Sequence, residues 1–179
     1  PGHQVVGDFL LESRHRPQAR TGEMLQKLFG VAKSKGTLNA AVQRCGGRQT
    51  ATEEAIKKQL RGSAVAHFDE TGFYVEGKRY WLHSASTEGL THYGWHPKRG
   101  KEATDALGIL PGFEGRAVHD GLSSYFQYGC DHALCNAHHL RESTCVQEKD
   151  SQLRAGDMKE LLLEIKSRGE QAKGEDAQT

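Results

Sequence analysis

Two aspartates that follow short apolar runs are the residues of this chain best suited to chemistry. Asp69 closes the run at 65–68 and Asp120 closes the run at 117–119, with a histidine shortly before each acid. We predict that both runs are strands, because a strand holds a carboxylate rigidly while its tip stays open to a hard cation. Adjacent strands would bring the two carboxylates together, as metal-dependent phosphoryl transfer requires.

The plainer interpretation of either aspartate is a turn residue at the end of a strand. Their shared design favours a joint site, because the chain between them is long enough for a hairpin, a strand and a crossover helix. A third acid is the weak point of this prediction. The candidates lie on predicted helices, where glutamate is usually a solvated surface residue: Glu142, Glu148, Glu160 and Glu164.

A compact basic loop at 97–101 precedes a predicted helix. Its charges Lys98, Arg99 and Lys101 suit a phosphate backbone, and so do the amides of a helix N-terminus. A solvated loop is the alternative. Beside it, Trp95 and His96 would either stack on a base or cover the edge of the sheet.

Cys135 and His138 stand in C-x2-H spacing, which raises zinc as a rival prediction. Structural zinc sites usually show two tight ligand pairs, and no second pair of that kind is evident here. We therefore favour a buried thiol at a strand end and a core histidine at a helix start. The other nearby candidates are Cys130, His132, His139 and Cys145.

Composition bounds the class of protein. A chain of 179 residues that is 36% hydrophobic predicts one principal core with a small appendage. The net charge of +1 hides a basic first third that could meet phosphates. Its cations are Arg14, Arg16, Arg20, Lys27, Lys33, Lys35, Arg44, Arg48, Lys57, Lys58 and Arg61.

The sequence shows no membrane span and no signal pattern, so we expect a cytoplasmic protein without a membrane partner. Its four cysteines form no evident disulfide framework. The chain begins with Pro1 and stops in a polar stretch, and we therefore expect a fragment of a longer reading frame.

The first part of the chain has a helical pattern. A helix from Arg20 is predicted to start at an N-cap Thr21 and to stop at Gly30, and a second begins after Ser34. Two helices around a glycine-containing turn, with a basic rim, are typical of a helix-turn-helix that binds DNA. Two packed helices that touch no DNA are the alternative. A third helix is predicted at 50–60.

Strand patterns begin near residue 64, so we predict a helical region at 1–62, an α/β domain at 63–168 and a polar tail at 169–179. The expected strands are 64–68, a hairpin of 73–76 and 79–86, then 90–95, 116–119 and 132–134. Helices are expected at 101–107, 136–148 and 157–168. This order predicts a mixed sheet with flanking helices.

Six ordered motifs within residues 20–168 resemble the central region of bacterial insertion sequence 66 family transposases. They are HFDETG at 67–72, YWLH at 80–83, HPKRG at 96–100, GILP at 108–111, VHD at 118–120 and LCNAHHLRE at 134–142. The resemblance implies a ribonuclease-H-like fold with a DDE-type acidic site. Such a site uses magnesium, or manganese, to cut and join DNA strands.

On this resemblance Asp69 is the first acid and Asp120 the second, while Cys135 and His138 match a C-x2-H signature that supports the site. The third acid of the family lies in a downstream glutamate-arginine motif that this chain does not contain, so we expect a fragment that is inactive alone. The implied partners are DNA ends and target DNA, further copies of the chain, and accessory proteins of the same element.

The sequence leaves two rival functions open. A nuclease of the same fold shares the hydrolytic step but lacks strand transfer. A zinc-stabilised DNA-binding module would use Cys135 and His138 and would lack catalysis, although zinc is not the cofactor that we expect.

Overall fold

The computed structural model describes residues 17–150 and 152–176. The chain divides into two compact units, residues 1–55 and 56–179, and each is described by itself. Two cations of the basic first third, Arg14 and Arg16, lie outside the described residues, as does the last part of the predicted tail. No helix in the described ranges is long and apolar enough to cross a bilayer.

The first unit contains the helices α2 (Gln18–Phe29) and α3 (Lys35–Arg48) and the start of α4 (Thr50–Arg61). As predicted, α2 stops at Gly30, whose φ of 67° is in the left-handed region. The predicted start at Thr21 is wrong. The helix begins at Gln18, and Thr21 is buried with its hydroxyl donating to the carbonyl of Pro17.

The N-terminus of α3 follows the prediction, because the hydroxyl of Ser34 accepts a hydrogen bond from the amide of Thr37. Leu25 of α2 and Leu38 of α3 are buried, and the two helices contact each other. A pair of helices joined by a short turn is therefore present. Its contact with DNA stays a prediction.

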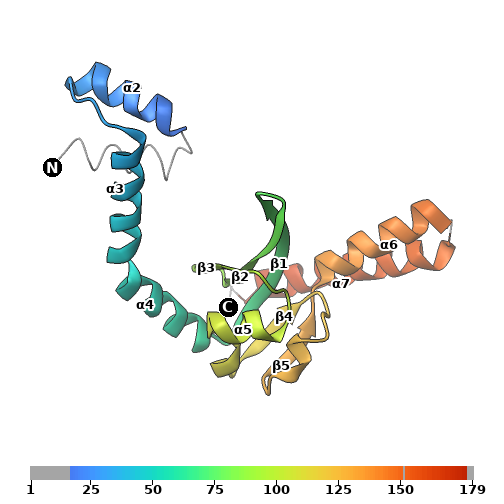
Figure 1. The fold of residues 1–179 in the computed structure, drawn as a ribbon. Helices are drawn as coiled ribbons and strands as arrows, with labels where there is room; N and C mark the ends of the chain where they lie inside the picture. The colour runs from blue at the N-terminus through green and yellow to red at the C-terminus, as the bar shows by residue number, and fades with distance from the viewer. Residues whose placement is uncertain (1–16, 151, 177–179) are drawn as a thin grey trace. The chain divides into compact units, whose positions relative to one another are not determined.

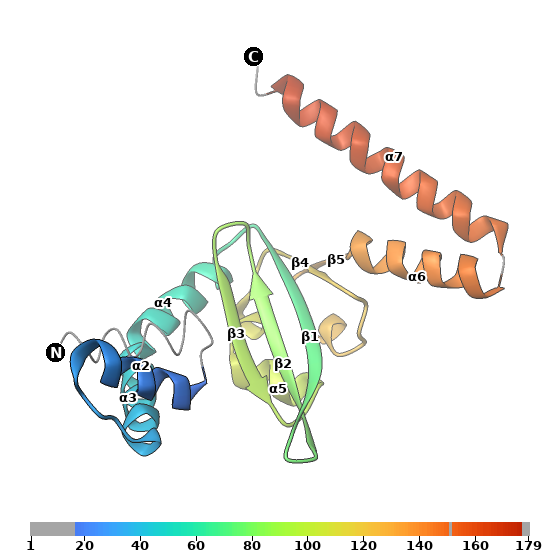
Figure 2. The same cartoon turned by 90° about the horizontal axis from the view of Figure 1, so that it is seen from above.

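The second unit is built on one five-stranded sheet with the order β3-β2-β1-β4-β5. Its strands are β1 (Val65–Val75), β2 (Lys78–Ser86), β3 (Thr91–His96), β4 (Arg116–His119) and β5 (Asp131–Leu134). The strands β3, β1, β4 and β5 run in one direction, and β2 runs in the opposite direction. Figure 2 shows β3, β2 and β1 side by side. This is the ribonuclease-H-like arrangement, and it confirms the predicted fold class.

The first strand differs from the prediction. Two strands at 64–68 and 73–76 were expected, but β1 is continuous because β2 pairs with it from His67 to Val75. The hairpin turns at Glu76 and Gly77, with φ of 51° and 76°, which is the positive φ pair of a two-residue turn. Asp69 therefore lies inside a strand and not at its end.

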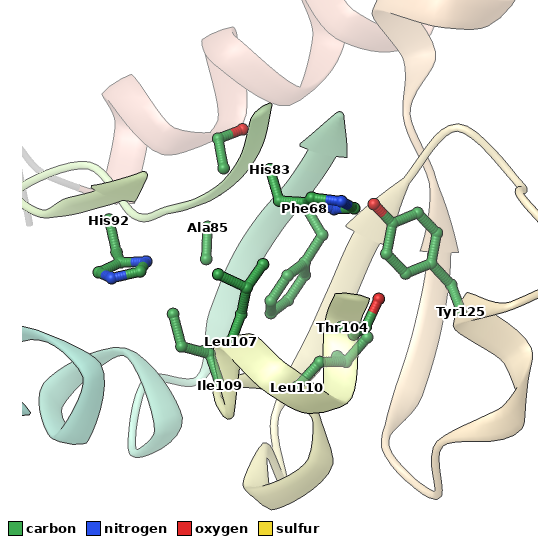
Figure 3. Close-up of a pocket in the computed structure, with 10 residues that line it drawn as sticks. Phe68, His83, Ala85, His92, Thr104, Leu107, Ile109, Leu110 and Tyr125 are labelled. Carbon is green, nitrogen blue, oxygen red and sulfur yellow. The ribbon is translucent and has the colours of Figure 1, made fainter. Parts of the chain in front are cut away.

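The hydrophobic core lies on one face of this sheet. Packed against the strands are α5 (Lys101–Leu107) and the short 3-10 turns η1 (Leu110–Gly112) and η2 (Tyr125–Gln127) (Figure 1). Figure 3 shows side chains from β1, β2, β3, α5 and η2 converging on the space between sheet and helix. The core cluster is Leu60, Ala66, Phe68, Ala85, Ile109, Leu110, Phe113, Ala117, Tyr125 and Cys130.

The opposite face of the sheet carries exposed aromatic side chains, including Tyr93 at 64% and Trp95 at 63% exposure. After β5 the chain continues as α6 (Asn136–Asp150) and α7 (Leu153–Asp176), which contact each other. Both helices were predicted, but each is longer than its apolar pattern indicated. The polar residues after Arg168 continue α7 as far as Asp176.

A glycine at the start of β4 sets how closely the sheet packs. A Cβ added to Gly115 would lie 2.3 Å from the carbonyl oxygen of Ser63 and 2.6 Å from that of Ala64. These are backbone atoms of the segment that leads into β1, so they cannot rotate away. We expect Gly115→Ala to lower the free energy of unfolding by about 1–3 kcal/mol in urea denaturation.

The matched control is Gly129→Ala, because a Cβ at Gly129 meets no atom within 4 Å and its φ is not positive. Equal free energies of unfolding for the two variants would show that there is room for a Cβ at Gly115.

Candidate active site between β1 and β4

Alternation along β1 separates the two neighbouring acids. Ala66, Phe68 and Glu70 are buried on the core face, whereas His67 and Asp69 are exposed on the other face. Successive side chains of a strand point to opposite faces, so this pattern follows directly from the strand. Asp69 is therefore free to meet a ligand, and Glu70 is not.

The parallel register of β1 and β4 puts the two predicted aspartates at corresponding positions along neighbouring strands. His67 is paired with Val118 in parallel register. Two residues beyond this pair are Asp69, which is still in β1, and Asp120, which lies in the bend directly after β4. Both carboxylates also contribute to the electrostatic field that raises the pKa of the Tyr125 hydroxyl.

A tight turn fixes the Asp120 carboxylate. Its Oδ1 accepts a hydrogen bond of 2.8 Å from the amide of Leu122, which is an Asx turn. The next residue, Gly121, has a φ of 94°, a conformation that residues with a side chain rarely adopt. One oxygen of Asp120 is thus held by the backbone, while Oδ2 faces the neighbouring side chains.

A chain of histidine hydrogen bonds supports this turn from the core side. The amide of Gly121 donates to Nδ1 of His119 at 3.0 Å, so the hydrogen of that ring is on Nε2. His119 Nε2 then donates to Nδ1 of His132 at 3.0 Å, and His132 Nε2 donates to the carbonyl of Tyr128 at 3.1 Å. Both rings are neutral in this pattern, and each has one defined tautomer.

Below the aspartates lies a buried carboxylate that the sequence did not single out. The side chain of Glu70 has 0% exposure. Its Oε1 accepts a 2.8 Å hydrogen bond from Nε of Arg99 and lies 2.7 Å from Nη2 of the same guanidinium, and its Oε2 accepts from the hydroxyl of Tyr125. Burial of the tyrosine and the adjacent Glu70 charge both raise the pKa of Tyr125, so this hydroxyl stays a donor.

The side chain of Arg99 joins the buried carboxylate to the exposed pair. Besides Glu70, its Nη2 lies 3.6 Å from Oδ2 of Asp120. The guanidinium carbon also lies 4.9 Å from the centre of the Trp81 ring, a cation–π distance. The basic loop therefore contributes a cation to the acid cluster.

The other two basic residues of this loop face solvent with acidic partners. Lys98 lies 3.7 Å from Glu102, with its side chain 65% exposed. Lys101 lies 2.7 Å from Asp105, one turn further along α5. Ion pairs as exposed as these contribute little to stability, so both cations remain accessible to an anionic partner.

Cys135 and His138 lie at the start of α6, where the amide of His138 donates to the carbonyl of Cys135 at 3.0 Å. The Nδ1 atom of His138 is buried with no hydrogen-bond partner. In residues 17–150 and 152–176, no set of three or more His, Cys, Asp or Glu side chains is placed to hold a metal ion. The cysteine and histidine are thus close, but no third ligand joins them.

Sequence reasoning missed Glu70, Tyr125 and the hydrogen bond between His119 and His132. A signal for Glu70 was available, since it continues the buried parity of Ala66 and Phe68. A charged residue at a buried strand position requires a partner. The identity of that partner was not available, because Arg99 and Tyr125 are 29 and 55 residues away along the chain.

Comparison with known proteins identifies the family of the chain. The model of the family described as "Transposase IS66 family" matches residues 11–179. Among solved structures, the chain is similar to one in the cryo-EM structure of the simian T-cell lymphotropic virus intasome in complex with PP2A regulatory subunit B56 gamma. The identity is 12% and the TM-score 0.33, over 88% of this chain and 64% of that chain. This chain thus spans less than two thirds of that chain. No curated protein matches.

Removing the tyrosine donor tests the buried acid. We expect Tyr125→Phe to lower the free energy of unfolding by about 1–3 kcal/mol, because the buried carboxylate of Glu70 loses one of its two partner side chains. The matched control is Tyr74→Phe, which removes a hydroxyl from a side chain that is 69% exposed. If both variants unfold at the same urea concentration, the Tyr125 hydroxyl does not stabilise Glu70.

The histidine chain predicts a dependence of stability on pH. Burial and the neighbouring His132 lower the pKa of His119 below its ordinary value of 6.5. The unfolded state therefore binds a proton before the folded state does, and the free energy of unfolding should fall as the pH drops below about 6.5.

Chemical denaturation between pH 8 and pH 5 measures this slope, and His119→Asn should reduce it while the exposed His67→Asn should not. A slope that stays unchanged in His119→Asn would assign the pH dependence to other groups, such as His83, whose pKa burial also lowers.

Proposed function

The chain belongs to the IS66 transposase family, and on that basis we propose that it serves in DNA transposition through metal-dependent cleavage at Asp69 and Asp120. The observation that supports this most directly is the strand register. It puts Asp69 and Asp120 at corresponding positions along two neighbouring parallel strands, which is the arrangement that a joint site needs. Breaking a phosphodiester bond and joining the freed 3′ hydroxyl to target DNA is the reaction that we assign to this site.

The donor set fits a divalent cation. Two carboxylates on rigid backbone are the oxygen ligands that Mg²⁺ and Mn²⁺ prefer. Asp69 is exposed and Asp120 keeps Oδ2 turned away from its own backbone, so each offers an oxygen. A bound metal would supply water activation and charge stabilisation at the leaving oxygen. The part of the chain that the structure describes places no third acidic ligand at this pair.

The cations beside the pair suit the DNA strand. We assign Lys98 and Lys101 to phosphate contacts, because both are exposed and lie in the segment that also delivers Arg99 to the acids. Such contacts position a strand without reading its sequence. Binding to both the element ends and the target would require further copies of the chain, which we include in this proposal.

A zinc-stabilised DNA-binding module is the second candidate. It draws support from the unpartnered Nδ1 of His138 one turn after Cys135. Structural zinc normally has four ligands. Stoichiometric zinc in the purified protein, released by Cys135→Ser, would favour this function over catalysis.

Metal titration tests the proposal. We expect isothermal titration with Mn²⁺ or Mg²⁺ to show binding that either Asp69→Asn or Asp120→Asn weakens at least about tenfold, because each substitution removes one of two charged ligands. Nicking of supercoiled DNA, where it is present, should follow the same dependence.

The control is Asp131→Asn. Asp131 is the first residue of β5, its side chain is 75% exposed, and it pairs with Arg116 at the start of β4. Metal binding that survives both of the first substitutions would refute a joint site, and equal loss in all three variants would indicate a general effect of charge.

A further inference from the structure

The position of Arg99 is unusual for a residue in an exposed basic loop. Its side chain is 42% exposed, yet its Nη2 atom is shared between a fully buried carboxylate and a half-buried one. The fully buried carboxylate is that of Glu70, beneath the candidate site. The half-buried one is that of Asp120, which belongs to the site. A role in attracting DNA alone does not explain why Arg99 contacts two carboxylates of its own chain.

Two contacts fix this arginine in place. Nε donates to Oε1 of Glu70 and Nη2 forms an ion pair with the same oxygen, which orients the guanidinium. Trp81 adds a second restraint, since its ring has Arg99 at 4.9 Å and Arg79 at 4.3 Å. The guanidinium is therefore held beside Asp120 and does not sample the surroundings freely.

The contact with Asp120 is looser than the contact with Glu70. The separation of Nη2 and Oδ2 is 3.6 Å, beyond an ordinary charged hydrogen bond, whereas the bonds to Glu70 are 2.7 Å and 2.8 Å. Arg99 can thus release Asp120 and keep Glu70. The oxygen that it faces, Oδ2, is the one that the Asx turn leaves available.

We propose that Arg99 is the internal counter-ion of Asp120, occupying its Oδ2 until a divalent metal ion takes that oxygen. This inference rests on the proposed function, because it requires that Asp120 binds metal. Arg99 is then a positioning residue that competes with the metal, and it is not one of the phosphate-binding cations with which the sequence grouped it.

Competition gives the effect a definite sign. A cation beside the carboxylate repels an incoming metal ion and must give up its own attraction to Oδ2. Removing the guanidinium should therefore tighten magnesium binding. A residue that merely helped the site to fold would have the opposite effect, because its loss would loosen the ligands.

Trp81 supplies a spectroscopic readout of the same event. The chain has two tryptophans, so Trp95→Phe leaves Trp81 as the only one. Movement of Arg99 away from Asp120 changes the cation at the Trp81 ring and hence its emission. Magnesium is suited to this titration because, unlike manganese, it is not paramagnetic.

The test compares magnesium binding in four chains that all carry Trp95→Phe: the parent, Arg99→Gln, Arg79→Gln and Asp120→Asn. We expect Arg99→Gln to bind Mg²⁺ about tenfold more tightly than the parent. Arg79→Gln removes the same charge from the same tryptophan without a contact to Asp120, so its affinity should stay within about twofold. A magnesium-dependent change in Trp81 emission should occur in the parent and be absent from Arg99→Gln and Asp120→Asn.

A second variant guards against misfolding, because Arg99→Gln alone leaves Glu70 buried with one donor. The double variant Glu70→Gln, Arg99→Gln removes both charges of that pair and should also bind Mg²⁺ more tightly than the parent. Unchanged or weaker binding in both arginine variants, with the parent binding normally, would overturn the counter-ion role and leave the proposed function intact. Absence of magnesium binding in every chain would overturn the proposed function, and the counter-ion role with it.

Discussion

The buried carboxylate of Glu70 is the constraint on which the rest of the site depends. An ionised acid with no solvent contact is costly unless donors compensate for the water it has lost. Its donors, Arg99 and Tyr125, come from the loop before α5 and from the turn after β4. Satisfying one side chain therefore draws two distant segments to β1. The same bonds bring Arg99 to Asp120 and place η2 against the core.

Strand alternation gives two consecutive acids different roles. Asp69 and Glu70 carry the same charge, but the pleat of β1 turns one toward solvent and the other into the packed face. The inner acid organises the neighbouring segments, and the outer acid is left exposed. For a member of the IS66 transposase family, this separates the residues that build the site from those that we propose to bind metal.

Much of the fold was predictable from local patterns. The mixed sheet was expected from short strands, a hairpin and a crossover helix, and α5 and β4 lie where their patterns placed them. The division of β1 into two strands was wrong because the polar residues Asp69, Glu70 and Thr71 resemble a turn when pairing with β2 is unknown. The N-cap at Thr21 was wrong because the helix begins earlier, at Gln18, and Thr21 is a buried residue within it.

The sequence by itself determined which residues could do chemistry. A histidine shortly before an aspartate in two strand patterns, and the family motifs, are properties of residue type and order. Only the tertiary structure decided how they act together. The parallel register of β1 and β4 puts Asp69 and Asp120 at corresponding positions along the two strands, and the burial of Glu70 turns a basic loop residue, Arg99, toward Asp120. Both are contacts between segments far apart in the chain, and local patterns carry no information about the partner that burial and pairing will select.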